Sequence, residues 1–145
     1  VSLRYEDKII ILYHFLKFGN HQNFVDNAGA GGLLCCLDHH GRVSEFAYDA
    51  LFKKNYAHPF TQKTFTNMIF PNFDHYERII TDCHKRLPHF DYVAWDFGLD
   101  ENNQYVLIEY NLLFPALKYN QVIYGPVLGE YLDGILDNLH EPEYR

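Results

Sequence analysis

The sequence lacks an excess of basic residues: 12 Lys and Arg stand against 19 Asp and Glu, for a formal net charge of −7 at pH 7. Because the phosphates of nucleic acid require a basic surface, this deficit argues against a nucleic-acid-binding protein. The sequence also lacks any run near the roughly 18 apolar residues of a membrane span, and it lacks the basic and apolar stretches of a signal peptide. We therefore expect a soluble, cytoplasmic protein with no membrane span.

Cysteine is scarce, and catalytic signatures of several common kinds are missing. Cys35 and Cys36 are adjacent and Cys83 stands alone, so no zinc-ribbon spacing occurs and we expect buried free thiols. His39 and His40 lie near the cysteine pair, but neighbouring strand residues face opposite sides, which disfavours a shared zinc ion. No Gly-Lys-Ser/Thr P-loop, Ser-His-Asp set or Cys-x-x-Cys is evident.

What the chain has instead is aromatic and β-branched segments, with 12 Tyr and 12 Phe among its 145 residues. Such segments, bounded by polar turn residues, predict strands over residues 8–19, 33–38, 42–49, 92–99 and 105–111. Apolar residues at helical spacing predict helices over residues 74–87 and 126–140, and residues 51–71 are typical of an irregular loop. This order of elements favours an α+β fold, an antiparallel β-sheet with flanking helices, in one domain over residues 1–145.

Residues 92–111 form the strongest local prediction, an antiparallel hairpin whose turn is the polar stretch "DENNQ". Counting outward from the turn places Asp96 opposite Glu109, with an uncertainty of one residue from a possible β-bulge. Asn111 lies two residues beyond Glu109 and so shares its face. We therefore expect three oxygen-bearing side chains to converge.

The same alternation assigns faces to the apolar residues of "LIEYN". By strict period two, Leu107 shares the face of Glu109 and Asn111, whereas Ile108 and Tyr110 point to the other side. Two carboxylates and an amide suit Mg²⁺, which takes few protein ligands and fills its octahedron with water and phosphate oxygens. The spacing alone also allows the ordinary alternative, in which the carboxylates simply face solvent.

The stretch "YVAWDFGLDENNQYVLIEYN" is similar to the carboxyl-terminal metal-binding hairpin of ATP-grasp enzymes, in which an Asp and a Glu-x-Asn bind magnesium ions. Together with "FVDNAGAGGLLCCLDHHGRV", "HPFTQKTF", "FPNFD" and "NQVIYG", it resembles the sugar-transfer-associated branch of that superfamily over most of residues 13–129. The resemblance implies the carboxyl-terminal half of an ATP-grasp fold. The chain begins at Val1, and we expect the adenine-binding lobe to lie upstream in the parent protein.

The resemblance also implies an activity: ATP and Mg²⁺ are used to phosphorylate a small-molecule carboxylate, and a nucleophile attacks the acyl phosphate. The implied metal ligands are Asp96, Glu109 and Asn111, and the implied catalytic and phosphate-facing cation is Lys17, where this branch more often has an arginine. Two departures from the family pattern are Tyr110, in the middle of Glu-x-Asn, and "LLFPAL" in place of a glycine-containing turn.

A glycine-rich stretch supplies a second polar feature, which can either expose backbone N–H groups to phosphate or form a plain hairpin corner. Its candidate binding residues are Asp26, Asn27, Gly31 and Gly32.

The sequence pattern leaves several assignments open. The pattern does not decide the roles of His58, Lys118 and Gln121. It also does not identify the carboxylate substrate or the nucleophile. The function predicted is an ATP- and Mg²⁺-dependent ligase linked to polysaccharide or cell-surface biosynthesis, present as a partial domain. The alternative is a binding or interaction domain that keeps the fold without catalysis.

Overall fold

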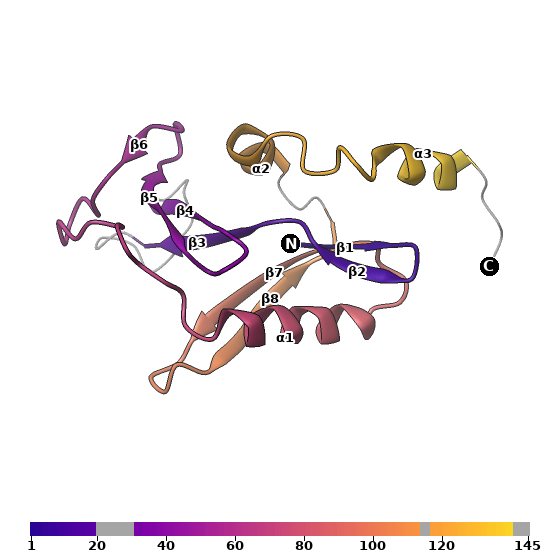
Figure 1. Cartoon of the computed structure of the whole chain (residues 1–145), viewed down its shortest axis with the longest axis horizontal. Coiled ribbons are helices and arrows are strands. Elements are labelled where there is room, and N and C mark those ends of the chain that lie inside the picture. The colour runs from indigo at the N-terminus through magenta and orange to yellow at the C-terminus, as the bar shows by residue number, and fades with distance from the viewer. Residues whose placement is uncertain (20–30, 114–116, 141–145) are drawn as a thin grey trace. The chain divides into compact units, whose positions relative to one another are not determined.

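The computed structural model describes residues 1–19, 31–113 and 117–140 (Figure 1). Its strands are β1 (Ser2–Tyr5), β2 (Lys8–Ile11), β3 (His14–Phe18), β4 (Leu33–Leu37), β5 (Val43–Tyr48), β6 (Lys54–Asn55), β7 (Tyr92–Leu99) and β8 (Tyr105–Asn111). Its helices are α1 (Phe73–Lys85), α2 (Leu117–Tyr124) and α3 (Leu132–His140). The α+β class predicted from the sequence is confirmed.

The chain forms two compact units, each with one antiparallel four-stranded sheet. Unit 1 comprises Val1–Tyr13 and His75–Arg145, and its sheet has the order β2-β1-β7-β8. Unit 2 comprises His14–Asp74, and its sheet has the order β3-β4-β5-β6. No helix in the described ranges is both long enough and apolar enough to cross a membrane.

The single strand predicted over residues 8–19 is wrong, because this run divides between the two sheets. β2 pairs with β1, which the sequence reasoning did not anticipate, through a turn at Glu6 with φ of 51°. Beyond Leu12 and Tyr13, β3 pairs instead with β4. The run contains no Pro or Gly before residue 19, so its composition gave no sign that the strand partner changes within it.

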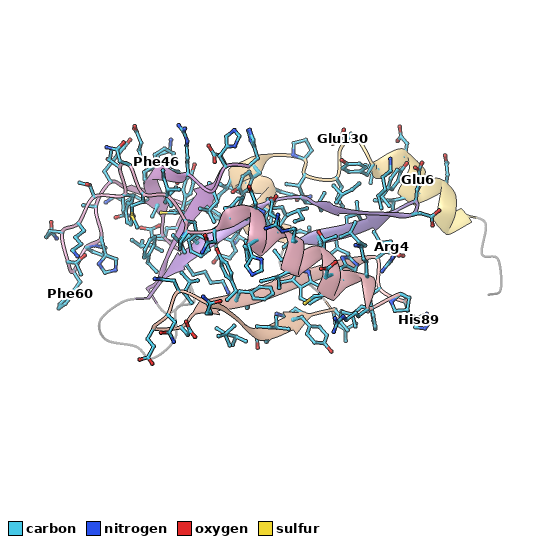
Figure 2. The ribbon with its side chains drawn as sticks, turned by 60° about the horizontal axis from the view of Figure 1, so that its bottom comes forward. Arg4, Glu6, Phe46, Phe60, His89 and Glu130 are labelled. Atoms are coloured by element: carbon cyan, nitrogen blue, oxygen red, sulfur yellow. The ribbon has the colours of Figure 1, made fainter. Side chains whose placement is uncertain are left out.

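The core of unit 1 lies between α1 and one face of its sheet. Ile80 of α1 and Val93 of β7 are fully buried and pack with Trp95. The predicted helix over residues 74–87 is thus present, ending at Lys85, before Pro88. At its C-terminal end the guanidinium of Arg4, a residue labelled in Figure 2, donates to the carbonyl oxygen of His84 at 2.9 Å. A cation there offsets the partial negative charge of the unpaired helix carbonyls.

A chain of hydrogen bonds runs through this core. The Trp95 Nε1–H donates to Ser2 Oγ at 2.7 Å, and Ser2 Oγ lies 2.7 Å from His84 Nδ1. The other ring nitrogen, Nε2, lies 2.9 Å from the carbonyl oxygen of Phe90. Because a carbonyl only accepts, Nε2 carries the proton and Ser2 donates to Nδ1. Burial lowers the pKa of His84, in keeping with a neutral ring.

The single terminal helix predicted over residues 126–140 is only partly correct. α3 lies within it, but α2 precedes it and was not predicted. Gly125 follows α2 with φ of 83°, the left-handed conformation that commonly ends a helix, and Pro126 comes next. Residues 126–131 are not helical and lead into α3, so their apolar spacing does not correspond to a helix.

α2 packs on the face of the unit 1 sheet that is opposite α1. Tyr92 alternates with the buried Val93 on β7, and its hydroxyl lies 3.1 Å from that of Tyr13. From α2, the buried Asn120 donates to the Tyr13 hydroxyl, and the ring of Tyr124 lies 5.6 Å from that of Tyr13. Burial raises the pKa of Tyr13, so this polar cluster is uncharged.

Unit 2 is built around the strands predicted over residues 33–38 and 42–49, which are confirmed as β4 and β5 and pair as an antiparallel hairpin. Its turn closes on Asp38, whose Oδ1 accepts the backbone N–H groups of His40 and Arg42 at 2.8 and 2.9 Å, with Gly41 at φ of 74°. The core includes Leu33, Cys35, Leu37, Ala47 and Phe65.

The cysteines and the loop of residues 51–71 behave much as expected. All three cysteines are free thiols; Cys35 is buried, which raises its pKa to about 12, while Cys36 and Cys83 are half-buried. Residues 51–71 are largely irregular, as predicted, apart from the short β6, which had not been expected.

Candidate functional site

The predicted hairpin of residues 92–111 has the bounds expected from the sequence. Its turn is closed by Asp100, whose Oδ1 accepts the backbone N–H groups of Asn102 and Gln104, each at 2.8 Å. Asn103 takes the left-handed conformation with φ of 57°, which asparagine tolerates better than most residues. The side chains of "DENNQ" therefore fix the turn, and the turn fixes the register of the strands.

The register places Asp96 directly opposite Glu109, as predicted. Near the turn Phe97 pairs with Leu107, so a regular ladder would have paired Asp96 with Ile108 instead. A shift of register between Asp96 and Phe97 inserts Ile108 as an extra residue. This β-bulge is what brings the two carboxylates onto one cross-strand pair.

The same bulge overturns the predicted faces of Leu107 and Ile108. Leu107 pairs with Phe97, which packs against the α1 core, so Leu107 belongs to the α1 face and not to the face of Glu109. Ile108 projects to the other face, since its Cδ1 lies 3.2 Å from the position that a Cβ on Gly98 would take. Strict alternation fails at one residue, and every side chain on the turn side of it changes face.

Asp96, Glu109 and Asn111 together form the candidate metal-binding hairpin. Tyr110 contacts Trp95 on the α1 face, with ring centroids 5.7 Å apart, so Glu109 and Asn111 point to the opposite face. Asn111 Nδ2 lies 3.5 Å from Glu109 Oε1. The Asp96 side chain is half-buried, whereas Glu109 and Asn111 are exposed at the edge of the sheet.

This donor set fits a hard cation. Two carboxylates and an amide are all oxygen donors, and their exposure leaves room for water and phosphate oxygens in the remaining coordination positions. Over the described ranges, no group of three or more His, Cys, Asp or Glu side chains is placed to hold a metal ion. A hairpin with two carboxylates suits a metal ion that also takes ligands from a nucleotide. It is less well suited to a metal ion held by protein side chains alone.

The buried polar cluster of Tyr13, Tyr92 and Asn120 lies on the same sheet face as Glu109 and Asn111. Ala94 pairs with Asn111, and Tyr92 is the next residue of β7 on that face. Sequence reasoning missed this cluster because α2 was not predicted. The available signal was the helical spacing of Asn120 with Leu117 and Tyr124 in a short helix.

The other predicted site residues belong to unit 2. Lys17 lies on β3 opposite Leu34, and Gly31 takes φ of 88° shortly before β4 begins. Gly32 follows it directly, whereas Asp26 and Asn27 lie outside the described residues. Their relation to the metal-binding hairpin stays a prediction.

The His58 side chain forms hydrogen bonds with its own loop and with the residue that follows strand β3. Its Nδ1 accepts the backbone N–H of Thr61 at 3.2 Å, so its Nε2–H donates to the carbonyl oxygen of Gly19, 3.1 Å away, at the end of β3. Lys118 and Gln121, whose roles the sequence left open, are exposed on α2.

A comparison with protein families is decisive. The model of the sugar-transfer associated ATP-grasp family matches residues 1–136. The chain belongs to this family. No curated protein and no solved structure matches it.

Membership confirms the resemblance drawn from the motifs and indicates an ATP-grasp-type function associated with sugar transfer. ATP-grasp proteins are generally ATP- and Mg²⁺-dependent, which agrees with the chemistry of the hairpin side chains. The two sheets and three helices are consistent with a partial ATP-grasp domain.

Proposed function

We propose that this chain is the carboxyl-terminal, metal-binding lobe of an ATP-grasp ligase that activates a small-molecule carboxylate. The observation that carries the proposal is the cross-strand pair of Asp96 and Glu109, with Asn111 two residues on along the same face. Family membership supports it, because the Asp and Glu-x-Asn pattern lies within the matched residues 1–136. The proposed process is polysaccharide or cell-surface biosynthesis in the cytoplasm.

In this proposal Asp96, Glu109 and Asn111 hold Mg²⁺. Bound there, the ion neutralises charge on the ATP phosphates and orients the transferred phosphoryl group. The amide nitrogen of Asn111 faces the Glu109 carboxylate, so its Oδ1 is the atom available as a ligand. The half-burial of Asp96 restricts its rotamers, which preorganises one of the two carboxylates.

Phosphate contacts are assigned to unit 2. Lys17 acts as a point cation that stabilises negative charge on the phosphates during transfer, without the bidentate geometry of an arginine. Gly31 and Gly32 permit close backbone approach to a phosphate, and Asp26 and Asn27 are assigned to the same ligand. The adenine is assigned to a lobe encoded upstream in the same parent chain.

The reaction is the transfer of the γ-phosphoryl group of ATP to a carboxylate oxygen, which gives an acyl phosphate and ADP. A nucleophile then attacks the acyl carbon and releases inorganic phosphate. Hydroxylamine is a suitable trapping nucleophile, because it converts any acyl phosphate to a stable hydroxamate.

The test uses the full-length parent protein with Mg-ATP, hydroxylamine and a panel of uronic, amino and hydroxy acids. We expect ADP and hydroxamate in equal amounts with at least one acid, and loss of both in Glu109→Gln but not in Glu101→Gln, an exposed carboxylate of the same hairpin turn. ADP release without hydroxamate across the panel, or equal activity of the two variants, would refute the ligase assignment.

A further inference from the structure

Two turns of unit 2 lie at the same end of its sheet. Both β3 and β5 run antiparallel to β4, so they are parallel to each other and their last residues lie at one end of the sheet. The turn of residues 49–53 directly follows β5. The turn of residues 57–64 is attached to the end of β3, because His58 Nε2–H donates to the carbonyl oxygen of Gly19. With strands about 4.8 Å apart, β3 and β5 lie about 10 Å from each other, on either side of β4.

The turn of residues 49–53 carries Leu51 at its apex. Asp49 Oδ1 accepts the backbone N–H groups of Leu51 and Lys53 at 2.9 and 3.0 Å. The backbone N–H of Phe52 donates to the carbonyl oxygen of Asp49 at 3.0 Å. These bonds close the turn with the Leu51 side chain outside it, 87% exposed, the highest value among the large apolar residues that the structure describes.

The turn of residues 57–64 presents Phe60 in a similar way. The backbone N–H of His58 donates to the carbonyl oxygen of Lys63 at 2.8 Å, and that of Gln62 donates to the carbonyl oxygen of His58 at 2.8 Å. Phe60, labelled in Figure 2, lies in the bend between these residues and is 59% exposed. Each turn at this end of unit 2 thus carries one large, exposed apolar side chain.

The only acidic or basic side chains of the segment that contains both turns, histidine aside, are lysines. Residues 50–73 include Lys53, Lys54 and Lys63 and no Asp, Glu or Arg. All three lysines are exposed. The segment is bounded by Asp49, which closes the first turn, and by Asp74 at the start of α1. In a chain of net charge −7, positive charge is therefore concentrated beside the two exposed apolar side chains.

This combination favours a membrane surface over a protein partner. Lysine is depleted at interfaces between proteins. Segments that bind at a membrane surface instead combine basic residues with apolar ones, which enter about 5–10 Å into the boundary between headgroups and acyl chains. A lysine beside an inserted apolar residue extends its stem along the apolar region and keeps its ammonium at the headgroups. Anionic lipids attract such lysines electrostatically.

We propose that the end of unit 2 formed by residues 49–53 and 57–64 binds the surface of a membrane that contains anionic lipids. Leu51 and Phe60 insert between the lipids, and Lys53 and Lys63 contact the lipid phosphates. The contact requires no membrane-spanning segment. The inference goes beyond the proposed function, because it needs neither ATP nor a metal ion and uses none of the residues assigned to them.

The experiment measures sedimentation of the full-length protein with lipid vesicles, in EDTA and without nucleotide. One set of vesicles is phosphatidylcholine alone, and the other is equal parts of phosphatidylcholine and phosphatidylglycerol. We expect at least about tenfold tighter binding to the anionic vesicles. Most of that preference should be lost at about 1 M salt, where the screening length is only about 3 Å. Absence of binding to the anionic vesicles, or equal binding to both sets, would overturn the inference.

Two double variants locate the contact. Leu51→Ser with Phe60→Ser removes both apolar groups and should weaken binding to the anionic vesicles at least about tenfold. Lys53→Gln with Lys63→Gln removes two cations and should also weaken it at least about tenfold. All four side chains are exposed, so the midpoint of thermal unfolding should stay close to that of the unaltered protein.

The controls are Ile69→Ser and Arg42→Gln, at the opposite end of the same sheet. Ile69 is 67% exposed and forms a bridge with Arg42, which is also exposed and directly precedes β5. Both control variants should bind the anionic vesicles as the unaltered protein does. The inference is wrong if the Leu51 and Phe60 double variant keeps full binding, or if the control variants lose as much binding as the two double variants.

Discussion

Asp96 lies directly opposite Glu109 because Ile108 is an extra residue in strand β8. The turn sets a register in which Asp96 would otherwise face an isoleucine. The β-bulge thus replaces a pairing of Asp96 with an apolar residue by a pairing of two carboxylates. It also places Leu107 on the side of the sheet that packs on α1. Bulges commonly re-aim side chains next to functional sites, and the function proposed for this hairpin depends on this one.

Replacing Ser2 by Ala should strongly destabilise the protein. The change leaves Trp95 Nε1–H and His84 Nδ1 in the core without their shared partner. Each buried polar group left unsatisfied costs about 1 to 3 kcal/mol, so we expect a loss of about 3 kcal/mol in the free energy of unfolding. Denaturant unfolding measures it, with Thr81→Ala as control, because the Thr81 hydroxyl donates to a carbonyl of its own helix. Equal losses in the two variants would contradict the account.

Stability should fall as the pH is lowered below neutrality. Burial lowers the pKa of His14 to about 3 and also lowers that of His84, whereas a histidine in the unfolded chain titrates near about 6.5. Between those values the unfolded state binds more protons than the folded state. The stabilisation is therefore complete above the unfolded value and is lost as the pH falls from about 6.5 toward 3.

The pH dependence can be assigned by substitution. Between pH 7.5 and 5, the unfolding free energy of His14→Phe should vary less with pH than that of the unaltered protein, because one buried neutral histidine is gone. His89→Gln removes an exposed histidine and should keep the original slope. A His14→Phe slope equal to that of the unaltered protein would count against the burial argument.

Gly41→Ala should be more damaging than Gly125→Ala. Both glycines have positive φ, 74° and 83°, so each substitution carries about 1 to 2 kcal/mol of backbone strain. At Gly41 the new Cβ would also lie 2.7 Å from Cγ of Phe73, whereas at Gly125 it would meet nothing within 4 Å. Overpacking adds about 1 to 3 kcal/mol of destabilisation at Gly41. The midpoint of thermal unfolding should therefore be lower for Gly41→Ala than for Gly125→Ala. The reverse order would show that Phe73 moves aside freely.

The contact between Asn120 and Tyr13 should couple α2 to the sheet. Asn120→Ala removes the donor to the Tyr13 hydroxyl and should cost about 1 to 2 kcal/mol. Tyr13→Phe removes the acceptor, and the double variant should lose less than the sum of the single losses. A double-mutant cycle of unfolding free energies measures the difference, and strict additivity would mean that the pair does not interact in solution.

The elements that could be predicted from the sequence are those whose signals are local. The hairpins of residues 33–49 and 92–111 carry their own turn chemistry in Asp38, Gly41 and Asp100, and their positions were correct. The division of residues 8–19 between two sheets could not be predicted, because pairing partners lie far along the chain. Counting outward from the turn predicted the pairing of Asp96 with Glu109, but that pairing, like the face of Leu107, depends on a β-bulge that alternation cannot reveal.

The helices near the carboxyl end illustrate the same limit. Residues 126–140 have apolar spacing throughout, yet Gly125 and Pro126 lead into a non-helical stretch and only α3 follows. α2 is held by Asn120 and Tyr124 against Tyr13, a contact between residues more than 100 positions apart. Tertiary contacts of this kind leave no periodic trace in the sequence.

Metal binding at the hairpin is the central claim, and titration of Mn²⁺ in the presence of ATP, followed by electron paramagnetic resonance of the free ion, tests it most directly. The full-length protein should take up Mn²⁺ in a nucleotide-dependent manner. Glu109→Gln and Asn111→Ala should each raise the Kd for the metal at least about tenfold, while Glu101→Gln should leave it unchanged. Equal metal affinity in all four proteins would contradict the assignment of Asp96, Glu109 and Asn111 as metal ligands.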